Sequence, residues 1–165
     1  MSDTYVECLV GRKPSIILTI CQWILTIVAG LGILYGLVAS PIIFIVGVVF
    51  GVGAFFVKRN ANLEFEYLYL DKEITIDKIM DKSKRKRVAK YDVEGIEIIA
   101  PVNSHELDSY NNRQVKVKDY STGIVDVPDT RYAMFYKGEE KVIFNPSGEL
   151  LNAIKTVAPR KVFLY

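Results

Sequence analysis

The longest uncharged segment of the chain restricts its fold more than any other feature. Between Lys13 and Lys58 lie 44 consecutive residues without Asp, Glu, Lys, Arg or His. A helix needs about 20 apolar residues to cross the hydrocarbon core of a bilayer, so this segment is long enough for two crossings. No soluble core explains so long an uncharged run in a chain of 165 residues. The sequence therefore predicts two transmembrane helices.

The run GLVASPIIF predicts where the two helices separate. Pro41 suits the first position of a helix, because its missing N–H would be unpaired there anyway, and Ser40 is a good N-cap residue. We expect one helix over about 15–38 and a second over about 41–57. The alternative is a re-entrant second segment, whose irregular backbone would need shelter that a small protein can hardly provide.

The charges beside the uncharged segment predict its orientation. Arg12 and Lys13 precede it, Lys58 and Arg59 follow it, and the connection near Ser40 carries none. Because basic residues favour the cytoplasmic side, both termini of this multi-pass cell-membrane protein are expected in the cytoplasm. A cleaved signal peptide is disfavoured, since the leader contains acidic residues and the apolar run is too long for a signal core.

Small residues predict how the two helices pack. Gly32 and Gly36 form one Gly-x-x-x-Gly motif, and Gly47 and Gly51 form another. Such motifs allow helices to approach closely. Gly32 and Gly47 are equally far from the break between the helices, which favours packing inside one hairpin. A homo-oligomer formed through other faces of the transmembrane helices remains an alternative.

From Asn62 onward the hydrophobic period changes to two, which is typical of half-buried strands. Seven strand-like runs follow: NLEFEYLYL, EITIDKIM, KRVAKY, IEIIAP, RQVKVKD, RYAMFYK and KVIF. A C-terminal helix is then predicted, with Asn145 as N-cap, Pro146 at its first position, and an apolar face that includes Leu151 and Ile154. The expected fold class is a membrane α-helical hairpin with an all-β domain, divided into segments 1–13, 14–57 and 58–165.

Seven antiparallel strands closed by an amphipathic helix resemble a pleckstrin-homology-like (PH-like) domain, built as a barrel or sandwich. A two-helix hairpin leading into such a domain resembles small bacterial membrane proteins of uncharacterised families. The runs KSKRKR and NPSGELLNAIKTVAPRKV are similar to segments of one such family. In eukaryotic PH domains the inositol-phosphate motif lies on the first hairpin, which here carries the net acidic turn from Leu70 to Glu73. Phosphoinositide binding is therefore not implied.

The second predicted hairpin carries five positive charges in six residues. They are Lys82, Lys84, Arg85, Lys86 and Arg87. The linker after the second helix spans at most about 14 Å, so the first strand begins at the membrane and the second returns to it. We therefore expect these five residues to contact anionic lipid or a protein partner weakly at the bilayer surface. A purely topological origin of the charges is the alternative. Nucleic acid is disfavoured, because stacking aromatics are missing from the run.

The sequence does not predict an enzyme, a cofactor or a metal site. It contains neither a phosphate-binding loop, nor a dinucleotide fingerprint, nor a nucleophile elbow. The only histidine, His105, lies beside Glu106 and Asp108 in a stretch that is more typical of a solvated loop. We expect a non-enzymatic module that docks lipid head groups or a partner. The alternatives are a scaffold that recruits a protein through the loops 102–112 and 120–130, and an enzyme that uses His105.

Overall fold

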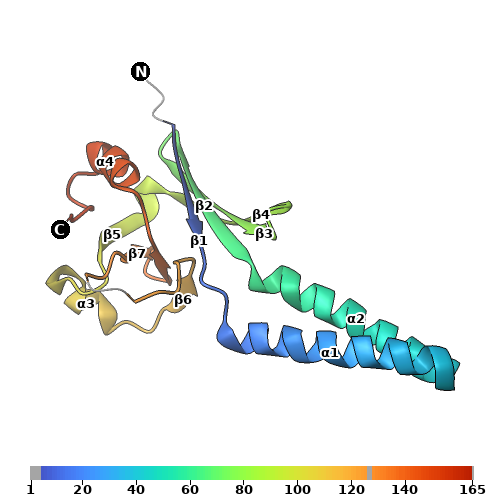
Figure 1. Ribbon diagram of the computed structural model, residues 1–165. Helices are drawn as coiled ribbons and strands as arrows, with labels where there is room; N and C mark the ends of the chain where they lie inside the picture. The colour runs from blue at the N-terminus through green and yellow to red at the C-terminus, as the bar shows by residue number, and fades with distance from the viewer. Residues whose placement is uncertain (1–4, 126–127, 165) are drawn as a thin grey trace. The chain divides into compact units, whose positions relative to one another are not determined.

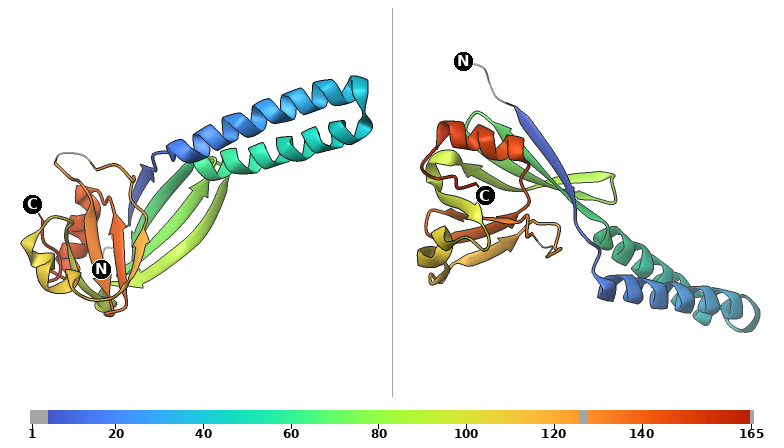
Figure 2. Two further views of the ribbon diagram at one scale, coloured as in Figure 1. Left: turned by 90° about the horizontal axis from the view of Figure 1, so that it is seen from below. Right: turned by 60° about the vertical axis from the view of Figure 1, so that its left-hand side comes forward.

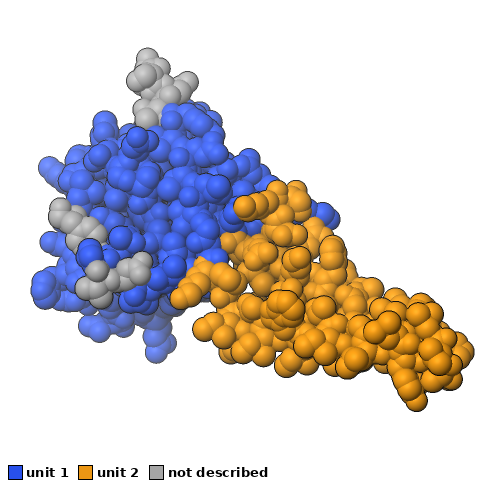
Figure 3. All heavy atoms as spheres, viewed as in Figure 1, with its two compact units in different colours: residues 1–12, 64–79, 84–165 blue, residues 13–63, 80–83 orange. Residues whose placement is uncertain are grey.

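The computed structural model describes residues 5–125 and 128–164 and divides the chain into two compact units. One unit comprises residues 1–12, 64–79 and 84–165, and the other comprises residues 13–63 and 80–83 (Figure 3). The strands are β1 Val6–Gly11, β2 Leu63–Leu70, β3 Glu73–Met80, β4 Lys84–Asp92, β5 Ile96–Pro101, β6 Lys116–Asp119, β7 Tyr132–Tyr136 and β8 Glu140–Phe144. The helices are α1 Ile16–Ala39, α2 Pro41–Ala61, α3 Asp108–Asn111 and α4 Gly148–Val157, with short 3₁₀ turns η1 Val93–Gly95 and η2 His105–Leu107 (Figure 1).

The second unit is dominated by a helical hairpin. Helices α1 and α2 run side by side, as both views of Figure 2 show, and Ser40 separates them with an extended backbone. Pro41 begins α2, while the Ser40 side chain makes no capping hydrogen bond. Helix α2 continues to Ala61, four residues beyond the predicted end at residue 57. Both helices are long and apolar enough to cross a membrane, and only 6% and 11% of their most apolar windows are buried.

Glycines lie where the two helices approach most closely. A Cβ atom built on Gly36 would overlap the backbone of Phe44, and one on Gly47 would lie 2.7 Å from the Ile33 nitrogen. On Gly32 it would lie 3.0 Å from the Cα of Gly47. Gly51 meets Ala29 at an ordinary van der Waals distance. The absence of a side chain at the first three positions is what allows the helices this separation.

The first sheet contains a strand that the sequence analysis did not predict. Its order is β1-β2-β3-β4, and β1 is antiparallel to β2, with Val6 opposite Tyr69 and Gly11 opposite Glu64. The expectation that residues 1–13 form a separate segment is therefore corrected for Val6–Gly11. The alternating side chains of β1 place Val6, Cys8 and Val10 against the hydrophobic core. The β-domain is thus assembled from chain segments on both sides of the helical hairpin.

Tight turns join β2 to β3 and β3 to β4 in the first sheet. Asp71 and Lys72 have φ values of 50° and 64°, and Asp81 and Lys82 have values of 49° and 52°. Positive φ at two successive turn residues matches the right-handed twist of the flanking strands. Connections as short as these require antiparallel strands.

The second sheet has the order β5-β7-β8-β6. Strands β5, β7 and β8 are antiparallel neighbours, whereas β6 is parallel to β8. The C-terminal segment covers part of the β5 edge, because Ile99 donates to the Lys161 carbonyl and Phe163 donates to that of Ile99. The residues described thus form eight strands in two four-stranded sheets, where seven antiparallel strands were expected.

Both sheets and α4 share one hydrophobic core. Fully buried members come from each layer, among them Tyr67, Ile76, Met134, Phe144, Leu150 and Ile154. The predicted C-terminal helix is present, but its cap is different. Ser147 is the N-cap, and its hydroxyl accepts a hydrogen bond from the Leu150 amide at 3.2 Å. Asn145 lies before the helix and has another role.

Candidate functional site

The basic hairpin, residues 80–87, is formed by the end of β3, a short turn and the start of β4. Asp81 and Lys82 occupy the left-handed region, and the Ser83 amide donates to the Met80 carbonyl at 3.2 Å. Only residues 81–83 connect β3 to β4 in this turn. Lys82 is exposed at the tip of the basic hairpin.

The tip of the basic hairpin is bonded to the residue that follows α2. The Asp81 amide donates to the Asn62 carbonyl at 3.0 Å, and both residues belong to the helical unit. The last turn of α2 contributes Lys58 and Arg59. Lys82 is therefore held next to the charged end of α2 by a backbone contact that does not depend on side chains.

Strand β4 divides its four basic residues between two faces. Successive side chains of a strand point to opposite faces, so Lys84 and Lys86 share one face and Arg85 and Arg87 share the other. All four are exposed. Lys82, Lys84 and Lys86 form no ion pair within the described part of the chain, so their charges are available to an external ligand.

The two arginines, in contrast, are paired with buried carboxylates. Glu66 on β2 and Asp77 on β3 are only 3% and 5% exposed. Arg85 forms an ion pair with Glu66, and its Nε lies 3.8 Å from Asp77 Oδ2. Arg87 Nε lies 3.6 Å from Asp77 Oδ1. Burying a carboxylate without a partner is unfavourable, so these arginines compensate charges inside the first sheet.

Hydrogen bonding around these carboxylates is incomplete. Asp77 Oδ1 is buried and accepts no hydrogen bond from any residue that the structure describes. Burial raises the pKa of Glu66, a hydrogen bond shared with Glu7 raises it further, and the Arg85 charge opposes both effects. The pKa of Glu7 is lowered, first by the hydrogen bond that its carboxylate accepts from Tyr5. Glu66 is thus the carboxyl of this pair that protonates more readily.

Sequence reasoning grouped the five basic residues as one set and missed the two carboxylates. Asp77 left no trace in the sequence, because it occupies the regular polar position after Ile76 in the alternating run EITID and is buried only in the folded strand. Glu66 left none, since it alternates with aromatic residues as an ordinary solvent-facing residue would. The burial of Glu66 depends on which side chains the neighbouring strands place over it.

The stretch around His105 is not a catalytic pocket. It folds into η2 and α3, and Leu107 from this segment packs with Phe135 and Ala133 in a second small core on the second sheet. The His105 side chain is fully exposed, and its Nδ1 lies 3.4 Å from Asp108 Oδ2. No group of His, Cys, Asp and Glu side chains with metal-site geometry occurs among the residues described.

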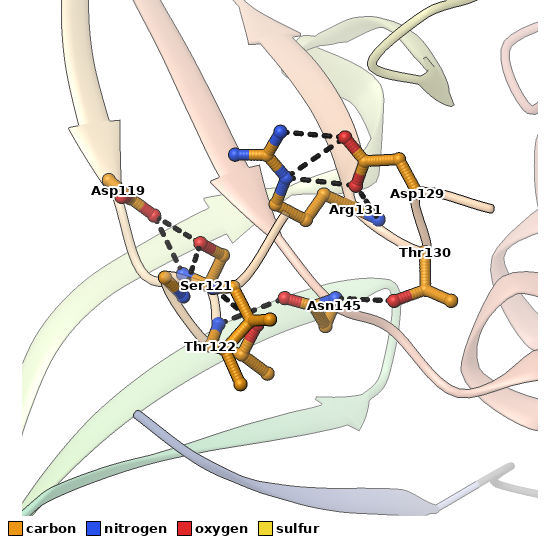
Figure 4. Close-up of polar contacts among 9 residues, drawn as sticks. Asp119, Ser121, Thr122, Asp129, Thr130, Arg131 and Asn145 are labelled. Carbon is orange, nitrogen blue, oxygen red and sulfur yellow. Dashed lines mark hydrogen bonds and ion pairs between the residues drawn. The ribbon is translucent and has the colours of Figure 1, made fainter. Parts of the chain in front are cut away.

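The connection from β6 to β7 is fixed by polar contacts (Figure 4). Asn145 accepts from the Thr122 amide at 2.9 Å and donates to Thr130 Oγ1 at 3.0 Å. Ser121 is fully buried and donates to Asp119 at 2.6 Å. This explains why Asn145 does not cap α4. The described part of this loop is therefore held to the domain, which weakens its role as an adaptable recruiting surface.

The two cysteines are free. Cys8 is partly buried in β1, and Cys21 is exposed on α1. A cleft of about 310 Å³ lies at the C-terminal end of α4 and includes Lys72, Arg160 and Lys161. The Lys161 ammonium already donates to the carbonyls of Val93 and Glu94, and the carbonyl end of a helix disfavours anions. The basic hairpin is the better candidate site.

A family model described as a bacterial PH-like domain (DUF6106) matches residues 2–164. The chain belongs to this family. The match confirms the resemblance inferred from the sequence. Membership of a PH-like family supports the expectation of a non-enzymatic module. Neither the search of curated proteins nor the search of solved structures returned a match. The matched range also covers β1 and both long helices, consistent with a domain whose first strand precedes the hairpin.

Proposed function

We propose that this chain is a double-pass membrane protein whose PH-like domain holds anionic lipid head groups at the cytoplasmic surface. One observation carries the proposal: three unpaired lysines lie on a hairpin whose tip is hydrogen-bonded to the residue after α2. If α2 leaves the bilayer at its charged end, Lys82 lies at the depth of the head groups.

The lengths of the two helices support a membrane span. At 1.5 Å per residue, the 24 residues of α1 measure about 36 Å and the 19-residue candidate span of α2 about 28 Å, close to a hydrocarbon core of about 30 Å. Their apolar side chains are mostly exposed, unlike those of a buried core helix. A bilayer would cover this surface.

The pairing of β1 with β2 supports an even number of crossings. Strand β1 precedes the hairpin and β2 follows it, so the two ends of the hairpin must emerge on the same side for the strands to pair. Arg12, Lys13, Lys58 and Arg59 flank the hairpin, and basic flanks favour the cytoplasmic side. In the proposed topology both termini lie in the cytoplasm.

The expected strength of the lipid contact is moderate. A basic residue near an anionic leaflet contributes on the order of 1 kcal/mol, so three lysines contribute at most about 3 kcal/mol, or roughly a hundredfold in affinity. Exposed charges are screened by salt within a Debye length of about 10 Å at 0.1 M. Such a contact orients the domain and enriches anionic lipid, while the apolar helices provide the attachment.

Native mass spectrometry of the full chain in an uncharged detergent tests the proposal. Bound phosphatidylglycerol and phosphatidylcholine are counted in separate titrations. We expect tighter binding of phosphatidylglycerol, and the Lys82→Gln, Lys84→Gln, Lys86→Gln triple variant should lose most of that preference. The matched control replaces exposed Lys72, Lys116 and Arg160 by Gln and should retain it.

Two results would contradict lipid docking. One is equal binding of both lipids by the unaltered chain, and the other is an unchanged preference in the triple lysine variant. In either case a protein partner becomes the better explanation for the exposed lysines. Cross-linking in native membranes would then identify it.

A further inference from the structure

Five cations on the basic hairpin do not act as one set. Lys82, Lys84 and Lys86 are exposed and lack ion-pair partners in the described chain, whereas Arg85 and Arg87 approach carboxylates on β2 and β3. The side chains of these two arginines remain 52% and 64% exposed. Each guanidinium is therefore close enough to solvent to reach an external anion once it leaves its carboxylate.

The Asp77 carboxylate is only partly compensated by the arginines, whereas Glu66 is in direct contact with Arg85. Asp77 lies 3.8 Å from the Arg85 guanidinium and 3.6 Å from that of Arg87, and its buried Oδ1 accepts no hydrogen bond from the described residues. Loose contacts of this kind hold a guanidinium by charge, not by the bidentate geometry that makes such pairs strong. A lipid phosphate can offer Arg that bidentate geometry.

Withdrawal of the arginines would leave buried charge behind. Removing one partner of a buried ion pair is strongly unfavourable, because the remaining charge is neither solvated nor compensated. This penalty applies only while Glu66 and Asp77 are ionised. Neutralising the two carboxyl groups removes it and leaves the arginines free to turn to another anion.

We propose that Glu66 and Asp77 restrain Arg85 and Arg87, so that the basic hairpin offers three cations to lipid while both carboxylates are ionised and five when they are neutral. This inference rests on the proposed lipid docking and adds its regulation. The ligand is the phosphate group of an anionic lipid in the adjacent leaflet. The two arginines are regulatory contacts, and the three lysines are permanent ones.

The neighbouring strands contain the groups that control this restraint. Within the described residues, the ionisable groups that face Glu66 and Asp77 are Glu7 on β1, whose carboxylate is hydrogen-bonded by Tyr5, and the two arginines on β4. Burial and Glu7 both favour the protonated form of Glu66. Acidification therefore neutralises Glu66, the direct ion-pair partner of Arg85.

A set of variants of the full chain in uncharged detergent tests the restraint, with phosphatidylglycerol affinity read by native mass spectrometry. Combining Glu66→Gln with Asp77→Asn should tighten binding about fivefold for each arginine released. Replacing Arg85 and Arg87 by Gln should change the affinity of the unaltered chain little. In the variant with Glu66→Gln and Asp77→Asn, the same arginine replacements should abolish the increase in phosphatidylglycerol affinity.

Unchanged affinity after neutralising the carboxylates would overturn the inference, as would an equal loss from the arginine replacements in both backgrounds. The variant with only the arginine replacements could fail to fold. In that case the phosphatidylglycerol affinity of the variant with neutral carboxyl groups is compared with that of the fourfold variant, which carries the carboxyl and the arginine replacements together. A titration from pH 7 down to pH 4 gives a second readout: binding by the unaltered chain should tighten as Glu66, whose pKa is raised, becomes protonated, and binding by the fourfold variant should not. Failure of the lysine triple variant to lose binding is a separate result that contradicts lipid docking itself.

Discussion

Gly11 and Glu64 lie opposite each other across β1 and β2, although residues 12–63 separate them in the chain. The entire helical hairpin is thus inserted into one β-hairpin connection. Both helices are attached to neighbouring strands of one sheet, and the β-domain needs the segment before the hairpin to complete that sheet.

The first prediction concerns this dependence on β1. A protein that begins at Lys58 lacks β1, which leaves the backbone edge of β2 unpaired and removes Val6, Cys8 and Val10 from the core, so it should show no cooperative thermal unfolding. A joined domain, in which residues 12–63 are replaced by Asn-Gly, should unfold cooperatively, because that dipeptide favours the two-residue turn between antiparallel strands. Near-ultraviolet circular dichroism measures the thermal unfolding of both proteins. Equal melting temperatures would show that β1 does not stabilise the domain.

The second prediction concerns the packing of α4. Leu151 and Ile154 are buried against the core, so Leu151→Asp or Ile154→Asp should bury an unpaired charge and lower the free energy of unfolding by several kcal/mol. The exposed neighbour Asn152 provides the control, because Asn152→Asp keeps the charge on the solvent side. Urea denaturation of the joined domain measures the differences. Similar stability for Ile154→Asp and Asn152→Asp would contradict this packing.

The third prediction concerns the contact between α1 and α2. Gly47→Leu should force the helices apart, since even a Cβ there would lie 2.7 Å from the Ile33 nitrogen. Gly53→Leu is the matched control on the same helix, because nothing lies within 4 Å of its Cβ position. The melting temperature of the full chain in detergent should fall for the first variant and hold for the second. The reverse order would mean that the helices pack through another face.

The fourth prediction tests the proposed orientation. In a chain with Cys8 and Cys21 replaced by Ser, Ser40→Cys should react with a membrane-impermeant thiol reagent in intact cells. Asn152→Cys should react only after the cells are opened, although it is exposed on α4. Labelling of Asn152→Cys in intact cells would place the β-domain outside and reverse the topology.

The fifth prediction concerns acid stability. Hydrogen bonds from Arg131, one of them 2.6 Å long, lower the pKa of Asp129 below its ordinary value, although the burial of this residue acts in the opposite direction. A lowered pKa means that the ionised group stabilises the fold above its ordinary pKa, and that this contribution disappears as the pH falls through the lowered value. The stability difference between the joined domain and its Asp129→Asn variant should be constant near neutrality and shrink below about pH 4. A constant difference down to pH 2 would exclude this linkage.

Much of the fold was predictable because it depends on local patterns. The alternation in β2, the apolar face of α4 and the uncharged helices are each visible within one segment of sequence. The missed strand has a weaker signal: Val6, Cys8 and Val10 face the core, but the intervening Leu9 is apolar and interrupts the polar alternation. It was overlooked because its partner lies beyond the hairpin, and sequence proximity suggested a separate leader.

The candidate site was less predictable because it depends on contacts between strands. Charge alone identified the basic residues, but not which of them already have partners. That division requires Glu66 and Asp77 to lie near β4, which follows from strand order and burial. The cap of α4 illustrates the same limit. Asn145 and Ser147 are both good N-cap residues, and the contacts of Asn145 with Thr122 and Thr130 decide between them.

The inserted hairpin has a consequence for biosynthesis. During translation β1 leaves the ribosome first, yet its neighbour β2 appears only after both helices have been made. In the proposed topology, a chain in which one helix failed to insert would leave β1 and β2 on opposite sides of the bilayer, and the first sheet could not close. Completion of the β-domain would then report that the hairpin had inserted correctly, and misinserted chains would expose an unfinished sheet to cellular proteases.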